Sequence, residues 1–265
     1  MKENKQQSIN LVWNTIVEES KVVLKNEPIL SQFLQNTILN HSGMGEAISY
    51  HLANKLSNSA LPAMLLQNLM NNIFNDESIL SATSRDIQAT VDRDSACSDY
   101  SIPFLYYKGF MALQAYRATH QLWSSGEKSL ALLLQHSISS KFAVDIHPAA
   151  KIGSGILIDH ATGLVIGETT VVEDCVSIMQ SVTLGGTGKE SGDRHPKIRK
   201  GVLLGPGAKV LGNIEIGEGS MVAASSVVLK SVAAHSIVAG VPATIVGTTQ
   251  VDEPSKAMNH YFKSD

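Results

Sequence analysis

The sequence predicts an α+β protein in which a bundle of short helices, residues 1–142, is followed by a parallel β-helix, residues 143–247. Over the first segment, apolar residues recur at the spacing of one helix face. After Phe142 the period changes to six, and glycine often follows the aliphatic residue that marks each repeat. A helix does not carry a period of six, whereas stacked β-solenoid coils do, so the two segments require different folds.

The helical segment carries its apolar residues at positions i, i+3, i+4 and i+7. Two such runs are Ile9, Val12, Trp13, Ile16 and Leu66, Leu69, Met70, Ile73. Helix-breaking residues separate the runs at Pro28, Pro62, Pro103 and Gly126. We therefore expect several short helices whose apolar stripes form a shared core.

The six-residue repeat predicts short strands, each with one aliphatic anchor pointing inward. The anchors are Ile146, Ile152, Ile158, Ile166, Val172, Ile178, Leu184, Ile198, Leu204, Val210, Ile216, Val222 and Val228. Three strands make one triangular coil, so these anchors predict about four coils stacked ~4.8 Å apart. The helical segment would cap one end, and the segment beyond Pro242, which continues into a C-terminal tail at residues 248–265, would cap the other.

Composition excludes several classes of function. The net charge of -3 provides no basic face for nucleic acid or for a membrane surface. The polar start lacks a signal peptide, and no apolar run approaches the ~18 residues of a membrane helix. Two cysteines, Cys97 and Cys175, cannot build a disulfide framework. We expect a cytoplasmic protein.

Counting anchors assigns each strand to a face and each insertion to a corner. Ile146 begins face one, Ile152 face two and Ile158 face three, and Ile166 returns to face one. His160 lies in a two-residue insertion after Ile158, at the corner between faces three and one. Asp145, just before Ile146, is expected at the same corner one coil earlier. A carboxylate beside an imidazole fixes its tautomer and strengthens it as a base.

A second histidine, His195, lies in the longer insertion between Leu184 and Ile198, at a different corner. A face of six residues is roughly 20 Å wide at ~3.3 Å per residue, so His160 and His195 should not meet within one chain. Corners of neighbouring prisms in a trimer can meet. The spacing therefore predicts a site shared between chains.

The longer insertion also contains Gly188 and Lys189, which invites comparison with a phosphate-binding loop. Thr183 stands where that motif requires its first glycine, and Glu190 stands where it requires serine or threonine. We therefore interpret the insertion as a loop that delivers Arg194 and His195.

Several segments together resemble one enzyme family. They are VDIHPAAKIG, DHATG, VSIMQSVTLGGTGK, DRHPKI and GAKVLGNIEIG in the repeats, with SYHLANKL, DIQA and YKGFMALQAYR in the helical segment. This pattern, from about Leu11 to Phe262, resembles the bacterial serine acetyltransferases. The resemblance implies a left-handed β-helix, which is an exception to the usual right-handed crossover. It also implies a homotrimer or a hexamer of two trimers.

The same resemblance implies an activity. The enzyme would transfer acetyl from acetyl-CoA to L-serine, giving O-acetyl-L-serine and CoA, in the first step of cysteine biosynthesis. L-cysteine would inhibit at the serine site, and no metal would be needed. The catalytic residues would be His160 as general base, Asp145 as its orienting carboxylate, and His195 near the reacting centre.

The resemblance also assigns the substrate contacts. Asp94 and Asp159 would hold the ammonium group of serine, and Arg194 its carboxylate. Ser95 stands where the family usually has proline after the first of these acids.

For acetyl-CoA, the family uses backbone amides between neighbouring coils. The matching positions are Gly186, Thr187, Gly205 and Ala224. Pro206 has no N–H to donate. Met221 replaces a lysine that resembles a CoA contact in relatives, and Lys209 or Lys230 would take its place.

Three alternatives remain at this point. An acyltransferase of the same fold that acts on a sugar or another acceptor need not have both Asp94 and Arg194. A zinc lyase similar to the γ-type carbonic anhydrases needs three converging histidines, and only His147 and His235 could join the two already named. A non-enzymatic scaffold would have no reason to carry an acid and a histidine at one corner.

The tail resembles the family tail through PSKAMNHYF. In many relatives an isoleucine at its end inserts into O-acetylserine sulfhydrylase, the next enzyme. Here Lys263, Ser264 and Asp265 stand at that place. A carboxylate side chain is costly to desolvate, so binding to that partner is expected to be weak.

Overall fold

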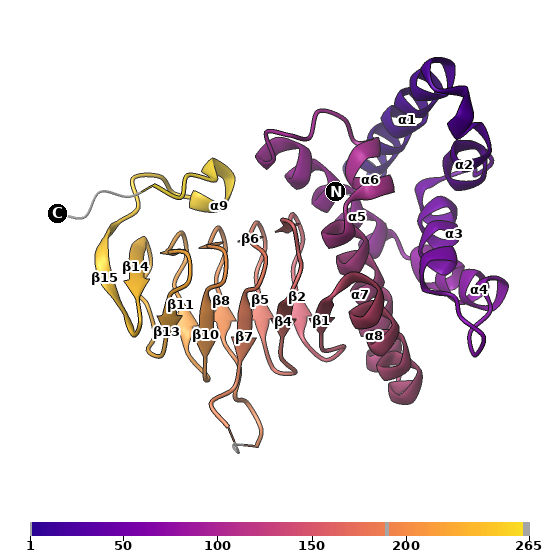
Figure 1. The fold of residues 1–265 in the computed structure, drawn as a ribbon. Coiled ribbons are helices and arrows are strands. Elements are labelled where there is room, and N and C mark those ends of the chain that lie inside the picture. Colours follow the sequence, from indigo (N-terminus) through magenta and orange to yellow (C-terminus); the bar gives the residue numbers. More distant parts are fainter. Residues whose placement is uncertain (1, 189–190, 262–265) are drawn as a thin grey trace.

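The computed structural model describes residues 2–188 and 191–261, in which helices precede a prism of stacked strands (Figure 1). The helices before the prism are α1 (Lys2–Asn26), α2 (Ser31–Leu34), α3 (Met44–Leu56), α4 (Ala63–Phe74), α5 (Glu77–Arg93), α6 (Ser101–Tyr106), α7 (Lys108–Ser124) and α8 (Lys128–Phe142). A 3-10 turn (Pro28–Leu30) and a π-helical turn (Gln35–Leu39) flank α2. The predicted helical bundle followed by a hexapeptide-repeat β-helix is confirmed.

Local sequence sets two boundaries that matter for the site. Asp76 caps the N-terminus of helix α5, because its Oδ1 accepts hydrogen bonds from Ser78 N at 2.7 Å and Ile79 N at 3.3 Å. Asp94 is the residue that caps the C-terminus of the same helix. Helix α8 ends at Ala143, whose left-handed conformation (φ 55°) turns the chain into the first strand.

The prism has three faces, and up to β13 each is a parallel sheet built from every third strand. Face one contains β1 (Val144–Ile146), β4 (Leu164–Ile166), β7 (Thr183–Gly185), β10 (Lys209–Leu211) and β13 (Val227–Val228). Face two contains β2 (Lys151–Ile152), β5 (Val171–Val172), β8 (Lys197–Ile198) and β11 (Glu215–Ile216). Face three contains β3 (Leu157–Ile158), β6 (Ser177–Ile178), β9 (Leu203–Leu204), β12 (Met221–Val222), β14 (Ser236–Gly240) and β15 (Ala243–Thr248).

The pairing register confirms the assignment of anchors to faces. On face one, Ile146 pairs with Ile166, which pairs with Leu184. On face three, Ile158 pairs with Ile178. Each anchor lies directly over the anchor of the preceding coil, so the apolar column is continuous along the prism axis.

The predicted number of coils is too low, because the prism has about five turns. Val232 bridges Ile216 on face two, and Val238 pairs with Val222 on face three, which completes a turn after Val228. The repeat shortens to four residues between Val228 and Val232, so a strict count of six loses it there. Strand β15 then folds back antiparallel on β14 and covers the open end of face three.

The tail returns along the outside of face three. Helix α9 (Pro254–Ala257) buries Ser255, whose Oγ donates to Cys175 O at 2.5 Å and whose carbonyl accepts from Ser177 Oγ at 2.8 Å. Met258 packs against Leu203, Met221 and Ile237. The predicted features at Lys263, Ser264 and Asp265 lie outside the described residues.

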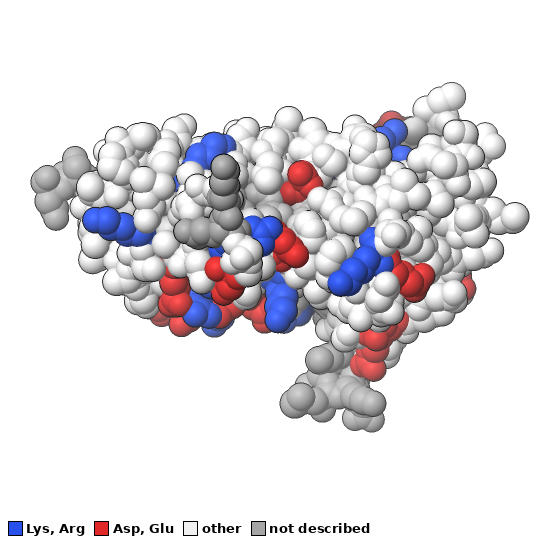
Figure 2. All heavy atoms as spheres, turned by 90° about the horizontal axis from the view of Figure 1, so that it is seen from below, with Lys and Arg blue, Asp and Glu red and all other residues white. Residues whose placement is uncertain are grey.

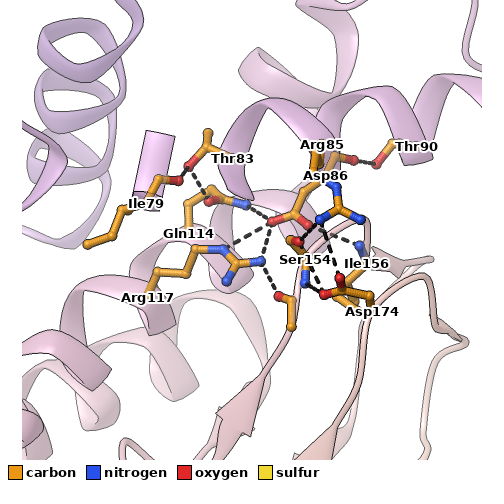
Figure 3. A network of polar contacts seen from close by, with 11 residues as sticks. Ile79, Thr83, Arg85, Asp86, Thr90, Gln114, Arg117, Ser154, Ile156 and Asp174 are labelled. Atoms are coloured by element: carbon orange, nitrogen blue, oxygen red, sulfur yellow. Dashed lines mark hydrogen bonds and ion pairs between the residues drawn. The ribbon is translucent and has the colours of Figure 1, made fainter. Parts of the chain in front are cut away.

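A buried ion pair joins the helices to the first coil (Figure 3). Asp86 of α5 is fully buried and accepts from Arg117 Nη2 of α7 at 2.6 Å and from the Ile156 backbone N–H at 3.0 Å. Gln114 Nε2 donates to the same carboxylate at 3.0 Å, and Arg117 Nη2 also donates to Gly153 O at 2.8 Å. Helices α5 and α7 are therefore fixed to the turn between β2 and β3.

Candidate active site between two prism corners

The corner between faces three and one, called here the 3–1 corner, carries His160. The imidazole is 70% exposed, and its Nε2 lies 3.7 Å from Asp159 Oδ2. Both residues follow β3, so the corner turn displays them outside the prism. An exposed imidazole beside a carboxylate is accessible to a substrate and suited to accept a proton.

The carboxylates of Asp159 and Asp94 act on each other at this corner. Burial raises the pKa of Asp159, His160 opposes the rise, and the charge of Asp94 adds to it. Asp94 follows α5, and its Oδ1 accepts from Ala96 N at 2.9 Å. The structure thus brings Asp94, Asp159 and His160 together from segments far apart in sequence. Two neighbouring carboxylates form a suitable site for a cation such as an ammonium group.

Tyr107 is a residue of this corner that the sequence analysis did not find. Burial raises the pKa of its hydroxyl, and a hydrogen bond and the charge of Asp94 raise it further. The same two effects, burial and the Asp94 charge, raise the pKa of Cys97 to about 11. Tyr107 therefore stays a neutral donor beside Asp94. A tyrosine directly before the helix of YKGFMALQAYR was the only signal in the sequence.

The expected contact between Asp145 and His160 does not form within one chain. Asp145 lies in the middle of β1, paired with Val165 on face one, rather than at the 3–1 corner. Its carboxylate accepts instead from Gln135 Nε2 of α8 at 2.7 Å. Counting anchors put Asp145 at the corner itself. Strand β1 begins one residue earlier, at Val144, so the corner precedes Val144 and Asp145 lies within the strand.

The corner between faces one and two, called here the 1–2 corner, carries Arg194 and His195. Thr169 organises both, because its Oγ1 accepts from Arg194 N at 3.0 Å and from His195 N at 3.1 Å. The Arg194 guanidinium pairs with Glu168 at 2.7 Å. Glu168 and Thr169 were not predicted, since in sequence they appear as ordinary corner residues of a repeat.

Hydrogen bonds fix the tautomer of His195. Its Nδ1 accepts from the Thr169 backbone N–H at 3.2 Å and lies 2.9 Å from Thr169 Oγ1. Burial lowers the pKa of His195, and the charge of Arg194 lowers it further. The ring is therefore neutral with its proton on Nε2, which makes Nε2–H a hydrogen-bond donor.

His147 links the end of β1 to this second corner. Burial lowers the pKa of His147, while the charges of Glu168 and Asp145 oppose that shift and the charge of Arg194 adds to it. Because His147 directly follows β1, it lies within reach of charges from both that strand and the 1–2 corner.

The four positions expected to contact acetyl-CoA divide between the same two corners. Gly186 and Thr187 follow β7 at the 1–2 corner, where a Cβ on Gly186 would lie 3.5 Å from Arg194 O. Gly205 and Ala224 stack at the 3–1 corner, where a Cβ on Gly205 would lie 2.8 Å from Ala224 N. The lack of a side chain at position 205 leaves the amide of Ala224, an exposed residue, uncovered between the two coils.

Figure 2 shows basic and acidic side chains interspersed on one face of the molecule. Across residues 2–188 and 191–261, no three His, Cys, Asp or Glu side chains are grouped to hold a metal ion. Within the same ranges, no helix combines the length and apolar character needed to cross a bilayer.

Comparison with known proteins identifies the family. Residues 12–115 match the model of the serine acetyltransferase N-terminal domain, and residues 195–230 match the bacterial transferase hexapeptide model. The chain is 52% identical over 257 residues to the serine acetyltransferase of Escherichia coli K12, covering 97% of this chain and 94% of that protein. The chain belongs to the serine acetyltransferase family. It is accordingly an acyltransferase.

Solved serine acetyltransferases share the whole fold. The enzyme from Vibrio cholerae superposes with a TM-score of 0.94 at 55% identity, covering 96% of this chain and 98% of that one. A serine acetyltransferase solved in complex with cysteine gives a TM-score of 0.93 at 53% identity, covering 95% of this chain and 98% of that one. A Brucella abortus complex with coenzyme A gives 0.88 at 50% identity, covering 90% and 96%. A soybean complex with serine gives 0.88 at 51% identity, covering 90% and 99%.

Proposed function

We propose that this acetyltransferase joins acetyl-CoA and L-serine at a site that two neighbouring chains of a trimer build together. The observation that carries the proposal is the division of the site. His160, Asp159 and Asp94 lie at the 3–1 corner, and Arg194 and His195 lie at the 1–2 corner. A face of roughly six strand residues, about 20 Å, separates the two corners in one prism. Prisms packed side by side bring the 3–1 corner of one chain to the 1–2 corner of the next.

The serine substrate would be held across this boundary. Its ammonium group would lie between Asp94 and Asp159, and its carboxylate would bind Arg194 of the neighbouring chain. Arg194 is paired with Glu168 at 2.7 Å, so the substrate carboxylate would share the guanidinium or displace Glu168. The soybean relative with bound serine supports L-serine as the acceptor.

His160 would act as the general base. It would accept the serine hydroxyl proton while the serine oxygen forms a bond to the thioester carbonyl carbon. When the carbon–sulfur bond breaks, the imidazolium would return that proton to the CoA thiolate. General-base assistance of this kind contributes roughly 10²–10⁴-fold to the rate. Asp145 of the neighbouring chain, held by Gln135, would support the imidazolium.

The negative charge on the tetrahedral intermediate requires a donor. His195 is suited to this role because Thr169 occupies its Nδ1 and leaves the Nε2 proton free to donate. Removing one donor of this type typically costs about 10²–10³-fold in kcat. Acetyl-CoA would lie along the coils, against Gly205 and Ala224 of one chain and against Gly186 and Thr187 of the next.

We further propose feedback inhibition by L-cysteine at the serine position. Cysteine carries the same ammonium and carboxylate groups, and a thiol replaces the hydroxyl. The relative solved with bound cysteine supports this. Inhibition should be competitive with serine, and inhibition that does not change as serine is raised would contradict a common site.

The deciding experiment measures thiol release from acetyl-CoA with each amino acid and with glucosamine in turn. L-serine alone should support rapid release, and the product should be O-acetyl-L-serine. Equal rates with glucosamine would refute the proposal and favour a sugar acyltransferase. Sedimentation of the full chain should give a trimer or a hexamer; an active monomer would refute the shared site.

A further inference from the structure

The turn that carries His160 has an unusual backbone conformation. His160 (φ 56°) and Ala161 (φ 63°) are both left-handed, and within the described ranges no other two consecutive non-glycine residues have positive φ. Non-glycine residues are strained in this conformation, so surrounding contacts must hold the turn. Within the turn, Ala161 N donates to Asp159 O at 2.6 Å and Thr162 N donates to His160 O at 2.7 Å.

The first turn of α7 supplies a contact from outside the prism. Lys108 Nζ donates to Thr162 Oγ1. The same hydroxyl lies 3.5 Å from His160 O, within reach to donate to that carbonyl. A hydroxyl that accepts from a cation is polarised and donates more strongly, so the lysine reinforces the closed turn.

The neighbouring residue brings α7 against the backbone of the turn. A Cβ on Gly109 would lie 2.1 Å from Ile158 O and 3.2 Å from Ala161 Cβ. Gly109 therefore allows the helix to approach on the side where β3 enters the turn, while Lys108 holds the side where the turn continues to Thr162.

Helix α7 is itself immobilised further along its length. Arg117 is bound to the buried Asp86, and the Tyr116 hydroxyl donates to Ala150 O in the first coil. A long lysine side chain costs conformational entropy to fix, but here its attachment point is already rigid.

We propose that Lys108 is a positioning residue for His160. Its ammonium group, presented by a fixed helix, holds Thr162 and so keeps the left-handed turn that aims the imidazole into the site. The inference rests on the proposed role of His160 as the general base. It assigns a function to YKGF, which lies outside the β-helix and outside the residues that touch substrate.

The test is a double-mutant cycle on the full-length enzyme. Lys108→Met should lower kcat by about 10- to 100-fold, because a displacement near 1 Å at the reacting centre can cost that much. KM for serine and for acetyl-CoA should change by less than about twofold, because the substrate contacts are intact. Thr162→Val should have a similar effect. The double variant should be no worse than either single variant, because the two residues act through one contact.

Two controls separate positioning from loss of charge. Lys108→Arg should recover most of kcat because it can still donate to Thr162. Lys21→Met removes a lysine that pairs with Glu18 on the exposed surface of α1, far in sequence from the turn, and it should match wild type. Hydrogen exchange of the amides from 160 to 164 should accelerate in Lys108→Met and not in Lys21→Met.

Other outcomes would overturn the inference. A raised KM for acetyl-CoA with an unaffected Thr162→Val enzyme would mean that Lys108 binds the nucleotide instead. Unchanged kcat and unchanged hydrogen exchange in Lys108→Met would mean that the turn keeps its conformation without the contact from Lys108. Both results leave the proposed function standing if His160→Ala is inactive, whereas an active His160→Ala enzyme would remove the proposed function first.

Discussion

The imidazole of His195 lies directly against the backbone of Gly167. A Cβ on Gly167 would lie 2.1 Å from both Cδ2 and Nε2 of the ring. Gly167 follows β4, so the coil below His195 provides the surface on which the ring rests. The absence of a side chain at position 167 thus sets the position of the Nε2 proton.

Gly167→Ala should therefore displace His195 and impair the reaction. No rotamer of the methyl group relieves a contact at 2.1 Å, so the ring must move. We expect kcat to fall by about 10²-fold, comparable to the loss of one oxyanion donor. Steady-state kinetics with serine and acetyl-CoA would measure the change.

Gly185→Ala is the matched control because Gly185 occupies the equivalent position one coil later. Its Cβ would meet only side-chain carbons, with Leu211 Cδ2 nearest at 3.2 Å. That variant should retain most of its activity. Equal losses in the two variants would show that the coil, rather than His195, is sensitive to the methyl group.

His160→Ala should lower kcat by at least the ~10²-fold expected for a lost general base. The side chain is 70% exposed, so its removal leaves the core intact. The thermal midpoint should therefore match wild type. A fully active His160→Ala enzyme would assign the base elsewhere.

The repeat could be predicted closely because it depends on one residue in six. Each coil buries its anchor in the same environment, so the pairing of Ile146, Ile166 and Leu184 can be predicted from their spacing alone. The last turn was missed where Val232 breaks the period. Such a break is allowed near the end of a solenoid, where fewer coils constrain the path.

The candidate site was predicted less completely because side-chain direction is not contained in spacing. Asp145 was placed at a corner, whereas β1 begins at Val144 and holds Asp145 within the strand on face one, where its carboxylate accepts from Gln135. Tyr107 joins Asp94 across the helical segment, and no local pattern reports that contact. Thr169, which sets the tautomer of His195, is a common residue in a common position.

Mixed trimers should test whether the site is shared between chains. His160→Ala and His195→Ala enzymes should each be impaired, because each lacks one group at every boundary. When their subunits are mixed by refolding or coexpression, some boundaries receive both intact histidines, and activity should return there. Native mass spectrometry would verify that mixed trimers form. Verified mixed trimers with no recovery of activity would place both histidines in one chain.

Serine binding should depend on pH through Asp159. Burial raises the pKa of this acid above its ordinary value of 3.8, so its proton is lost at higher pH than from an exposed aspartate. The ammonium group of serine binds the charged form, so KM for serine should fall as pH rises through that raised pKa. The stability of the fold has the opposite dependence on pH. Because the pKa of Asp159 is higher in the folded than in the unfolded chain, its contribution to the free energy of unfolding is present below the unfolded pKa. That contribution is lost as pH rises through the folded pKa.

The control for this dependence is Asp159→Asn, which cannot titrate. Its KM for serine should be higher than that of wild type and should lose the acid-side change. Inhibition by cysteine should follow the same profile in wild type because cysteine carries the same ammonium group. A wild-type KM for serine that is constant from pH 4 to neutrality would contradict the role of Asp159, since this range begins just above the ordinary value of 3.8 and the raised pKa lies above that value.

Breaking the buried pair of Asp86 and Arg117 should cost more stability than breaking the exposed pair of Glu18 and Lys21. Asp86→Ala leaves the Arg117 guanidinium, 9% exposed, without its carboxylate, and leaves the Ile156 N–H without an acceptor. Removing one partner of a buried pair costs about 3–5 kcal/mol.

Asp86→Asn keeps an acceptor oxygen for Ile156 and should cost less stability than Asp86→Ala. Glu18→Ala, which breaks the exposed pair with Lys21, should cost about 1 kcal/mol or less. Urea unfolding at one fixed protein concentration would rank the three, because subunit association also adds to stability. Equal midpoints for Asp86→Ala and Glu18→Ala would show that the helices and the prism do not depend on this pair for their attachment.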